Sequence, residues 1–246
     1  MDILVCISKT PDTTAKISFK NNDTEYNTDG VNFIMNPYDE WYALVRAIEL
    51  TEQLGGSVTV LNVGPSSNDI IIRKALAVGG AGAVRIDTDA TDSYTVAANI
   101  AEYAKSKHYD MIFLGKETID YNGSEVGAMV AELLDLPFIS YAIQMESDGN
   151  SSTITREIEG GVEVCKVEGP AVISAAPGLA QQRIPNMKGI MMAKSKPLTV
   201  VPAILQDPKV STVKYQLPPA KSGVKLVDPE NMDELVRLLH EEARVI

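Results

Sequence analysis

A polar, glycine-containing segment from 115 to 127 holds the residues whose types and spacing best suit ligand binding. It reads Gly-Lys-Glu-Thr-Ile-Asp-Tyr-Asn-Gly-Ser-Glu-Val-Gly, and a helical pattern over 128–134 follows it. Small residues that lead into a helix N-terminus present backbone N–H groups to an anion. The segment therefore predicts a site for a phosphate or another anion.

Sequence motifs of the common enzyme classes are absent. The chain has no GxSxG elbow, no HExxH pair and no P-loop lysine. His108 and His240 occur at predicted helix ends, where a solvated role is the default. Cys6 lies in an apolar run and Cys165 on a predicted hairpin strand, and neither is spaced to pair with a base. We therefore expect no catalytic residue, no metal site and no enzyme activity.

Composition and charge narrow the class of protein. The 246 residues carry 22 basic and 33 acidic side chains, a net charge of −11 that disfavours a broad nucleic-acid surface. Two widely spaced cysteines indicate a reducing compartment. The sequence has no apolar stretch of about 20 residues and no signal-peptide pattern at its start. These features predict a cytoplasmic protein that does not insert into a membrane.

The elements that must position the polar segment alternate between strands and helices. Apolar runs predict buried strands at 2–7, 58–63, 83–86 and 111–114. Helical patterns separate them at 69–78, 93–107 and from Asn36-Pro37 onward, with Asn36 as the cap and Pro37 in the first turn. This order predicts an α/β fold with a doubly wound, mostly parallel, Rossmann-like sheet, whose ligands bind at the carboxyl ends of the strands.

Later segments depart from this alternation. Residues 11–30 allow a hairpin excursion, strands at 142–146, 153–159 and 162–167 form a β-hairpin extension, and 171–175 is the last clear parallel strand. We divide the chain into an α/β domain (1–178), a Met-rich loop and short helix (179–197) and a Pro-punctuated arm that ends in an amphipathic helix (198–246). The arm is expected to cover another protein, and the alternative is an arm wrapped on its own domain.

Seven short segments occur in an order that matches a known family. They are residues 3–12, 29–31, 35–40, 75–81, 114–120, 156–161 and, with Arg183 just before it, 190–197. Together they resemble the β subunit of electron transfer flavoproteins over nearly the whole chain. The resemblance implies an adenine nucleotide alpha hydrolase-like version of the predicted fold.

The resemblance also implies the function and the partners. In that family the subunit forms a heterodimer with an α subunit that holds most of a redox-active FAD, and it usually binds AMP itself. Electrons pass from flavin dehydrogenases, such as the acyl-CoA dehydrogenases of fatty acid oxidation, through the FAD to a membrane quinone oxidoreductase or another acceptor. The chain is thus expected to be an electron carrier subunit in which the flavin supplies the redox chemistry.

Nucleotide-binding positions carry over from this resemblance. They are Cys6, Asn36, Pro37, Tyr38, Asp39, Val63, Gly115, Asp120, Asn122, Gly123, Ser124, Glu125 and Val126. AMP-binding members read Asn-Gln-Thr where this chain has Ser124-Glu125-Val126. Val126 lacks the threonine hydroxyl, and the Glu125 carboxylate repels a phosphate if it points inward. A valine also resembles bifurcating members with a second FAD, so AMP, FAD and an empty site stay open.

Partner-binding positions are implied in the same way. They are Glu157, Arg183, Met187, Ile190, Met191 and Lys194. Glu157 matches a glutamate that pairs with an arginine of the mobile flavin domain of α, and Met187 matches a leucine that anchors the recognition loop in dehydrogenases. A rival from another class is a stand-alone nucleotide-binding module of the universal-stress type, which does not explain the long arm.

Overall fold

The computed structural model describes residues 1–89, 92–204, 206–221 and 223–246. Its contacts divide the chain into two compact units. One unit comprises Met1–Ile17 with Asn27–Val213, and the other comprises Ser18–Tyr26 with Lys214–Ile246. The larger unit contains the central sheet and the candidate site.

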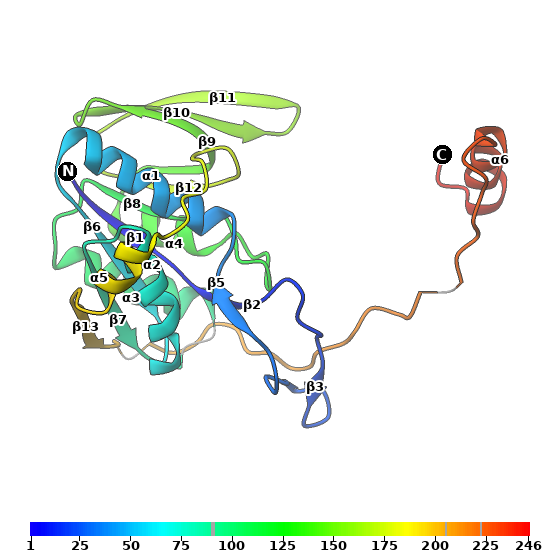
Figure 1. The fold of residues 1–246 in the computed structure, drawn as a ribbon, viewed down its shortest axis with the longest axis horizontal. Coiled ribbons are helices and arrows are strands. Elements are labelled where there is room, and N and C mark those ends of the chain that lie inside the picture. Colours follow the sequence, from blue (N-terminus) through cyan, green and yellow to red (C-terminus); the bar gives the residue numbers. More distant parts are fainter. Residues whose placement is uncertain (90–91, 205, 222) are drawn as a thin grey trace. The chain divides into compact units, whose positions relative to one another are not determined.

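Within the described residues, nine strands form one sheet (Figure 1). Their order is β11 (Gly161–Glu168), β10 (Ser151–Ile158), β9 (Phe138–Ser147), β12 (Ala171–Ala175), β8 (Met111–Gly115), β1 (Asp2–Cys6), β6 (Ser57–Val63), β7 (Gly82–Asp87) and β13 (Leu198–Pro202). Neighbouring strands from β9 to β13 run parallel, whereas β10 and β11 form the antiparallel extension. The predicted α/β class and hairpin extension are confirmed.

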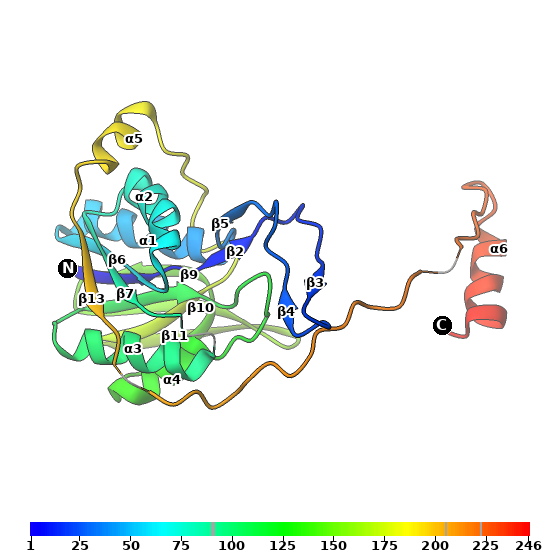
Figure 2. The ribbon, with the colours of Figure 1, turned by 90° about the horizontal axis from the view of Figure 1, so that it is seen from below.

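Helices cover both faces of the sheet (Figure 2). On one face lie α1 (Asp39–Leu54), α2 (Asp69–Val78), which a short 3-10 turn over Ser66–Asn68 precedes, and α5 (Met187–Ala193). On the other face lie α3 (Ser93–Lys105) and α4 (Val126–Leu134). Each face has its own apolar core, because the side chains of buried parallel strands alternate between the two faces.

Strand β1 occupies the middle of the sheet, as its apolar run predicts. Ile3, Leu4 and Val5 are fully buried. Ile3 lies beside Val58 of β6 on one side and beside Met111 of β8 on the other. The carboxyl ends of these three strands therefore lie next to one another.

The start of α1 differs from its prediction. Helix α1 begins at Asp39, after Tyr38 with a positive φ of 62°, and no side chain caps it. The predicted cap, Asn36, directs its amide to a distant loop instead, and Pro37 precedes the helix. The prediction was wrong because a long-range partner competes successfully for the Asn36 amide, a contact that local spacing does not reveal.

Strand β13 is an element that the sequence did not predict. It pairs in parallel with β7, from Leu198 beside Ala83 to Pro202 beside Asp87. Prolines at 197 and 202 obscured this β-branched run, but proline is tolerated in an edge strand, where one side of the backbone needs no partner. The chain after 178 thus contributes the outer strand of the sheet.

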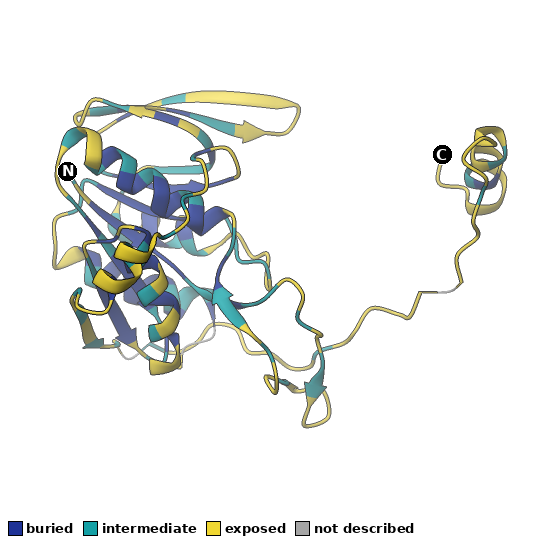
Figure 3. Ribbon diagram, viewed as in Figure 1, coloured by how far each residue is buried: buried dark blue, intermediate teal, exposed yellow. Residues whose placement is uncertain are grey.

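Two further pairs of short strands occur among the residues that the structure describes. In the larger unit, β2 (Lys9–Pro11) pairs with β5 (Phe33–Met35). In the smaller unit, β3 (Phe19–Lys20) pairs with β4 (Glu25–Tyr26), which confirms the predicted hairpin excursion. The ring of Phe19 stacks on Tyr215 with centroids 4.8 Å apart. Figure 3 shows that β11 is largely exposed and β10 only in part, in contrast to the buried central strands.

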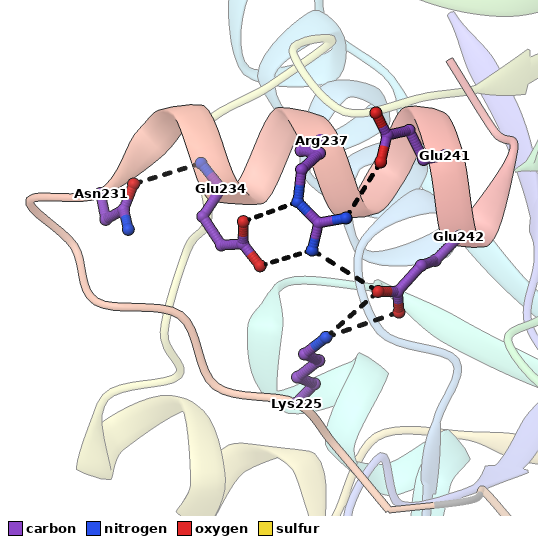
Figure 4. A network of polar contacts seen from close by, with 6 residues as sticks. All are labelled: Lys225, Asn231, Glu234, Arg237, Glu241 and Glu242. Atoms are coloured by element: carbon purple, nitrogen blue, oxygen red, sulfur yellow. Dashed lines mark hydrogen bonds and ion pairs between the residues drawn. The ribbon is translucent and has the colours of Figure 1, made fainter.

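The last part of the chain is helical, as predicted. Helix α6 (Met232–Arg237) continues as π-helical turns over Leu238–Ala243. Asn231 caps α6 by accepting a 3.2 Å hydrogen bond from the N–H of Glu234. Arg237 links Glu234, Glu241 and Glu242, and Lys225 also contacts Glu242 (Figure 4). These exposed pairs add little to stability.

Candidate functional site

A cavity of about 410 Å³ opens at the carboxyl ends of β1, β6 and β8. Cys6, Val63 and Gly115 bring these three strand ends to its wall. Residues from the first turns of α3 and α4 also line it, together with residues 116–118, 121 and 123–125. The sequence placed a ligand at this edge of the sheet, and ligand pockets of about 300–1,000 Å³ are typical of small-molecule sites.

The interior of the cavity is largely apolar. Its side walls come from strands β6 and β8 and from helices α3 and α4: Leu61, Val96, Ile100, Leu114 and Met129. Helix α4 packs closely on β8 at Gly127. A Cβ added to Gly127 would lie 2.6 Å from a Leu114 methyl carbon, so glycine permits this packing. Such a wall suits a flat heterocycle, with polar groups confined to the rim.

Of the predicted nucleotide-binding residues, seven line the cavity and six do not. Those on the wall are Cys6, Val63, Gly115, Gly123, Ser124, Glu125 and Val126. Those absent from it are Asn36, Pro37, Tyr38, Asp39, Asp120 and Asn122. Asn36 acts on the site indirectly: its amide nitrogen donates to the carbonyl of Glu117 (2.9 Å) and its amide oxygen accepts from the N–H of Ile119 (3.0 Å). It therefore fixes the loop that follows β8.

The loop end of the cavity combines an anion-binding backbone with acidic side chains. Residues Gly123 to Gly127 lead into α4, whose first N–H groups have no intrahelical acceptors. Ser124 donates from Oγ to the carboxylate of Glu117 (3.1 Å). The Glu125 side chain folds back toward Gly123: a Cβ added to Gly123 would lie 3.2 Å from Oε1 of Glu125. Two carboxylates thus oppose the attraction of the helix for a phosphate.

Glu40 is a buried carboxylic acid on the cavity wall that sequence reasoning missed. Its carboxylate accepts a 2.7 Å hydrogen bond from the N–H of Ser8 and another from the Ser8 hydroxyl. Burial raises the pKa of Glu40 to about 8, although these two hydrogen bonds lower it. Burial, with a smaller effect of Glu40, also raises the pKa of the Cys6 thiol far above its usual value, so Cys6 stays neutral.

The pKa values of Asp39, which precedes Glu40 in the chain, and of Lys116 on the cavity wall are also shifted. Burial raises the pKa of Asp39 to about 6, although the nearby Lys116 ammonium lowers it. Lys116 forms an ion pair with Glu117 (3.3 Å) and lies over the ring of Tyr141 (5.0 Å). Burial alone would lower the pKa of Lys116, but its contact with Glu117 raises it overall. The ammonium thus remains charged near the loop.

A segment from the edge of the sheet closes another side of the cavity. Lys209, Val210 and Thr212 line it. The Asp92 carboxylate accepts hydrogen bonds from the N–H of Thr95 (3.3 Å) and from the N–H of Lys209 (3.0 Å), which ties this segment to the start of α3. The contact spans 117 residues, and local sequence patterns contain no signal for it.

These features fit an adenine nucleotide. The apolar walls suit the base, and the start of α4 suits a phosphate. The lining contains the carboxyl groups of Glu40, Asp92, Glu117 and Glu125 and the ammonium groups of Lys116 and Lys209. A phosphate at this cavity would therefore meet the N-terminus of α4 and these two lysines rather than a general excess of positive charge.

Three of the predicted partner-binding residues around α5, Met187, Ile190 and Met191, belong to an exposed apolar surface that we call the docking face. Ile184 and Met192, which were not predicted, complete it. Met187 is 73% exposed and Met191 69%. Arg183 does not project freely, because its guanidinium pairs with both carboxylate oxygens of Glu52 (2.8 and 2.9 Å). A second hollow of about 450 Å³ lies beneath this segment, beside the end of α2.

Glu157 lies apart from the docking face, on the exposed extension. It is opposite Val162 in the β10–β11 pair, and its side chain is exposed. The neighbouring Arg156 pairs with Glu163 of β11 (2.8 Å). Its role toward another subunit stays a prediction.

Neither metal clusters nor spanning helices occur in the part of the chain that the structure describes. Across residues 1–89, 92–204, 206–221 and 223–246, no group of three or more His, Cys, Asp or Glu side chains is placed to hold a metal ion. Over the same ranges, each helix is too short or too polar to cross a bilayer.

Comparisons with known proteins agree with the resemblance. The profile of the electron transfer flavoprotein domain matches residues 23–206. The chain is 36% identical to the electron transfer flavoprotein subunit beta of Bacillus subtilis over 260 residues, covering 100% of both chains. It is 38% identical to the protein of that name from Syntrophomonas wolfei, covering 93% of this chain and 90% of the relative. Identity to the Mus musculus protein is 33%, covering 98% of each chain.

Proposed function

Because the chain belongs to the electron transfer flavoprotein β-subunit family, we propose that it is the β subunit of a heterodimeric carrier that binds an adenine nucleotide, AMP in the first instance. The family consists of electron carriers rather than catalytic enzymes, and its β subunits normally pair with an α subunit. In our proposal the α subunit holds most of the FAD, which supplies the redox chemistry. This chain supplies a nucleotide site, part of the flavin surroundings and a docking surface.

The cavity at the strand ends is the observation that carries the nucleotide part of this proposal. Three strand ends, an apolar interior and the first turn of α4 meet there. The apolar walls would hold the adenine and exclude water from it, and the N–H groups of α4 would hold the phosphate. Ser124, Glu125 and Val126, which differ from the residues of AMP-binding members, line this loop end. In our proposal the Glu125 carboxylate and the missing hydroxyl at Val126 weaken the contact with the phosphate, and the adenine can still bind between the apolar walls.

The docking face supports the electron-transfer part. A row of exposed methionine and isoleucine side chains is unfavourable in water, and flexible methionines adapt to several partner surfaces. Basic residues border it, including Lys188 and Lys194. This combination favours a flavin dehydrogenase with an apolar pocket and an acidic rim, such as an acyl-CoA dehydrogenase. A quinone oxidoreductase of the membrane would accept the electrons.

Co-expression with its α partner tests the composition that we propose. The purified complex is denatured, and the released cofactors are identified by absorbance and mass spectrometry. One FAD with one AMP per heterodimer supports the proposal. Two FAD molecules would indicate a bifurcating subunit, for which Val126 in the cavity wall is the supporting observation. Recovery of a nucleotide but neither flavin nor α subunit would indicate a stand-alone nucleotide-binding module.

A further inference from the structure

Helix α5 approaches α2 so closely that only glycine fits at the contact. A Cβ added to Gly189 would lie 2.5 Å from the carbonyl oxygen of Ala77. Real Cβ atoms do not come this near to a backbone oxygen, so any side chain here must displace one helix. Asn186 begins α5 by accepting a 2.8 Å hydrogen bond from the N–H of the same Gly189.

Two cations hold the ends of α2 and α5 together. Arg73 of α2 donates to the carbonyl of Ala193 (2.8 Å), at the end of α5, and to that of Lys196 (2.6 Å). The Lys196 ammonium donates in return to the carbonyls of Leu76 (2.8 Å) and Gly80 (2.6 Å), at the end of α2. The last carbonyls of a helix lack intrahelical donors and carry partial negative charge. Each segment therefore caps the other.

The four hydrogen bonds of Arg73 and Lys196, with the close contact at Gly189, form what we call the clamp, and they leave the docking face pointing outward. Its members are exposed, from 44% for Ile190 to 78% for Ile184, whereas Ala193 on the same helix is buried. Seven residues form a helix too short to be stable alone, so the conformation of α5 depends on its contacts with α2. Gly189, Arg73 and Lys196 make those contacts on the side opposite to the docking face.

We propose that Gly189, Arg73 and Lys196 are positioning residues for partner docking, which fix α5 in its bound conformation before a dehydrogenase arrives. The proposal rests on the docking function proposed above. A mobile α5 would have to be ordered during binding, and the apparent affinity would fall in proportion to the competent fraction. The clamp avoids this loss without contacting the partner.

Two variants of the α/β complex test the proposal. Gly189→Ala keeps every charge and every side chain of the docking face and favours helix formation, so its effect comes from the displacement of α5. Arg73→Gln removes one half of the clamp. For both we expect a roughly three- to tenfold higher KM for the complex in a coupled dehydrogenase assay. We expect unchanged kcat and flavin content, and faster hydrogen exchange of amides 187–193.

The controls separate this inference from the docking function itself. Lys105→Met removes one charge from α3, on the other face of the sheet, and should leave KM unchanged. Met187→Ala tests the docking face directly. If Met187→Ala raises KM while both clamp variants leave it unchanged, positioning by the clamp is wrong and docking stands. If all three variants leave KM unchanged, both fail. Faster exchange with an unchanged KM also contradicts the clamp proposal.

Discussion

The carboxylate of Glu40 accepts a 2.7 Å hydrogen bond from the backbone N–H of Ser8, which joins the first turn of α1 to the end of the central strand at the cavity wall. Glu40 is only 5% exposed. A carboxyl group held in this way is costly to ionise, because burial outweighs its two hydrogen bonds. The residue thus couples the wall of the proposed nucleotide site to pH.

Glu40 should make stability fall as the pH rises toward 8. Its folded-state pKa of about 8 lies above the unfolded value of 4.5, so the folded chain retains a proton that the unfolded chain has released. The free energy of unfolding therefore decreases through that window. Asp39 contributes to this decrease in stability only up to a pH near its own pKa of about 6. Above that pH, Glu40→Gln should flatten the decline and raise Tm by several degrees near pH 8.

Thermal unfolding between about pH 6.5 and pH 8 checks this prediction. Glu102→Gln serves as the control, since Glu102 is exposed on α3. A parallel decline in the original protein and in Glu40→Gln would show that Glu40 is not the group responsible.

Removal of the Glu125 charge should strengthen phosphate binding. Glu125 is exposed beside the loop that leads into α4, so Glu125→Gln should lower the Kd for AMP about two- to fivefold. The gain should shrink at high salt. Titration with adenosine is the matched control, because a neutral nucleoside lacks the phosphate. Equal gains for AMP and adenosine would place the effect on the base end instead.

Glu157 should influence the motion of the α subunit rather than its binding. An exposed ion pair contributes at most about 1 kcal/mol, which shifts the populations of a mobile domain without holding it shut. Glu157→Ala should change the electron-transfer rate with several dehydrogenases at constant flavin content. Glu159→Ala, at an exposed position in the adjacent turn, is the control. If the rates do not differ from those of the control, Glu157 has no such role.

The last helix should bind the α subunit. Met232, Leu235 and Val236 of α6 are 51%, 37% and 54% exposed, so its apolar face lacks a partner within this chain's described residues. Deletion of residues 226–246 should loosen the complex with α during size-exclusion chromatography. Leu235→Asp in the full chain should act in the same direction. Full stoichiometry and an unchanged Tm for both variants would remove the arm from the interface.

The buried core of the fold was predictable from the sequence, but several positions around the site were not. Apolar runs such as 2–7 identify strands that are buried on both faces, because the side chains on both faces of such a strand are buried and the local sequence alone shows it. By contrast, the amide of Asn36 satisfies backbone groups 81 and 83 residues away, and Asp92 bonds an N–H 117 residues away. Glu40 was missed because its burial, rather than its sequence context, makes it unusual.

Electron transfer itself tests the central claim most directly. The α/β complex is mixed in a stopped-flow instrument with an acyl-CoA dehydrogenase and its substrate, and the loss of oxidised flavin absorbance in the complex is followed. We predict rapid reduction that requires this chain and is slowed severalfold by Met187→Ala at limiting concentrations of the complex. Equally fast reduction of the α subunit alone, or no reduction of the complex by any flavin dehydrogenase tested, would contradict this prediction.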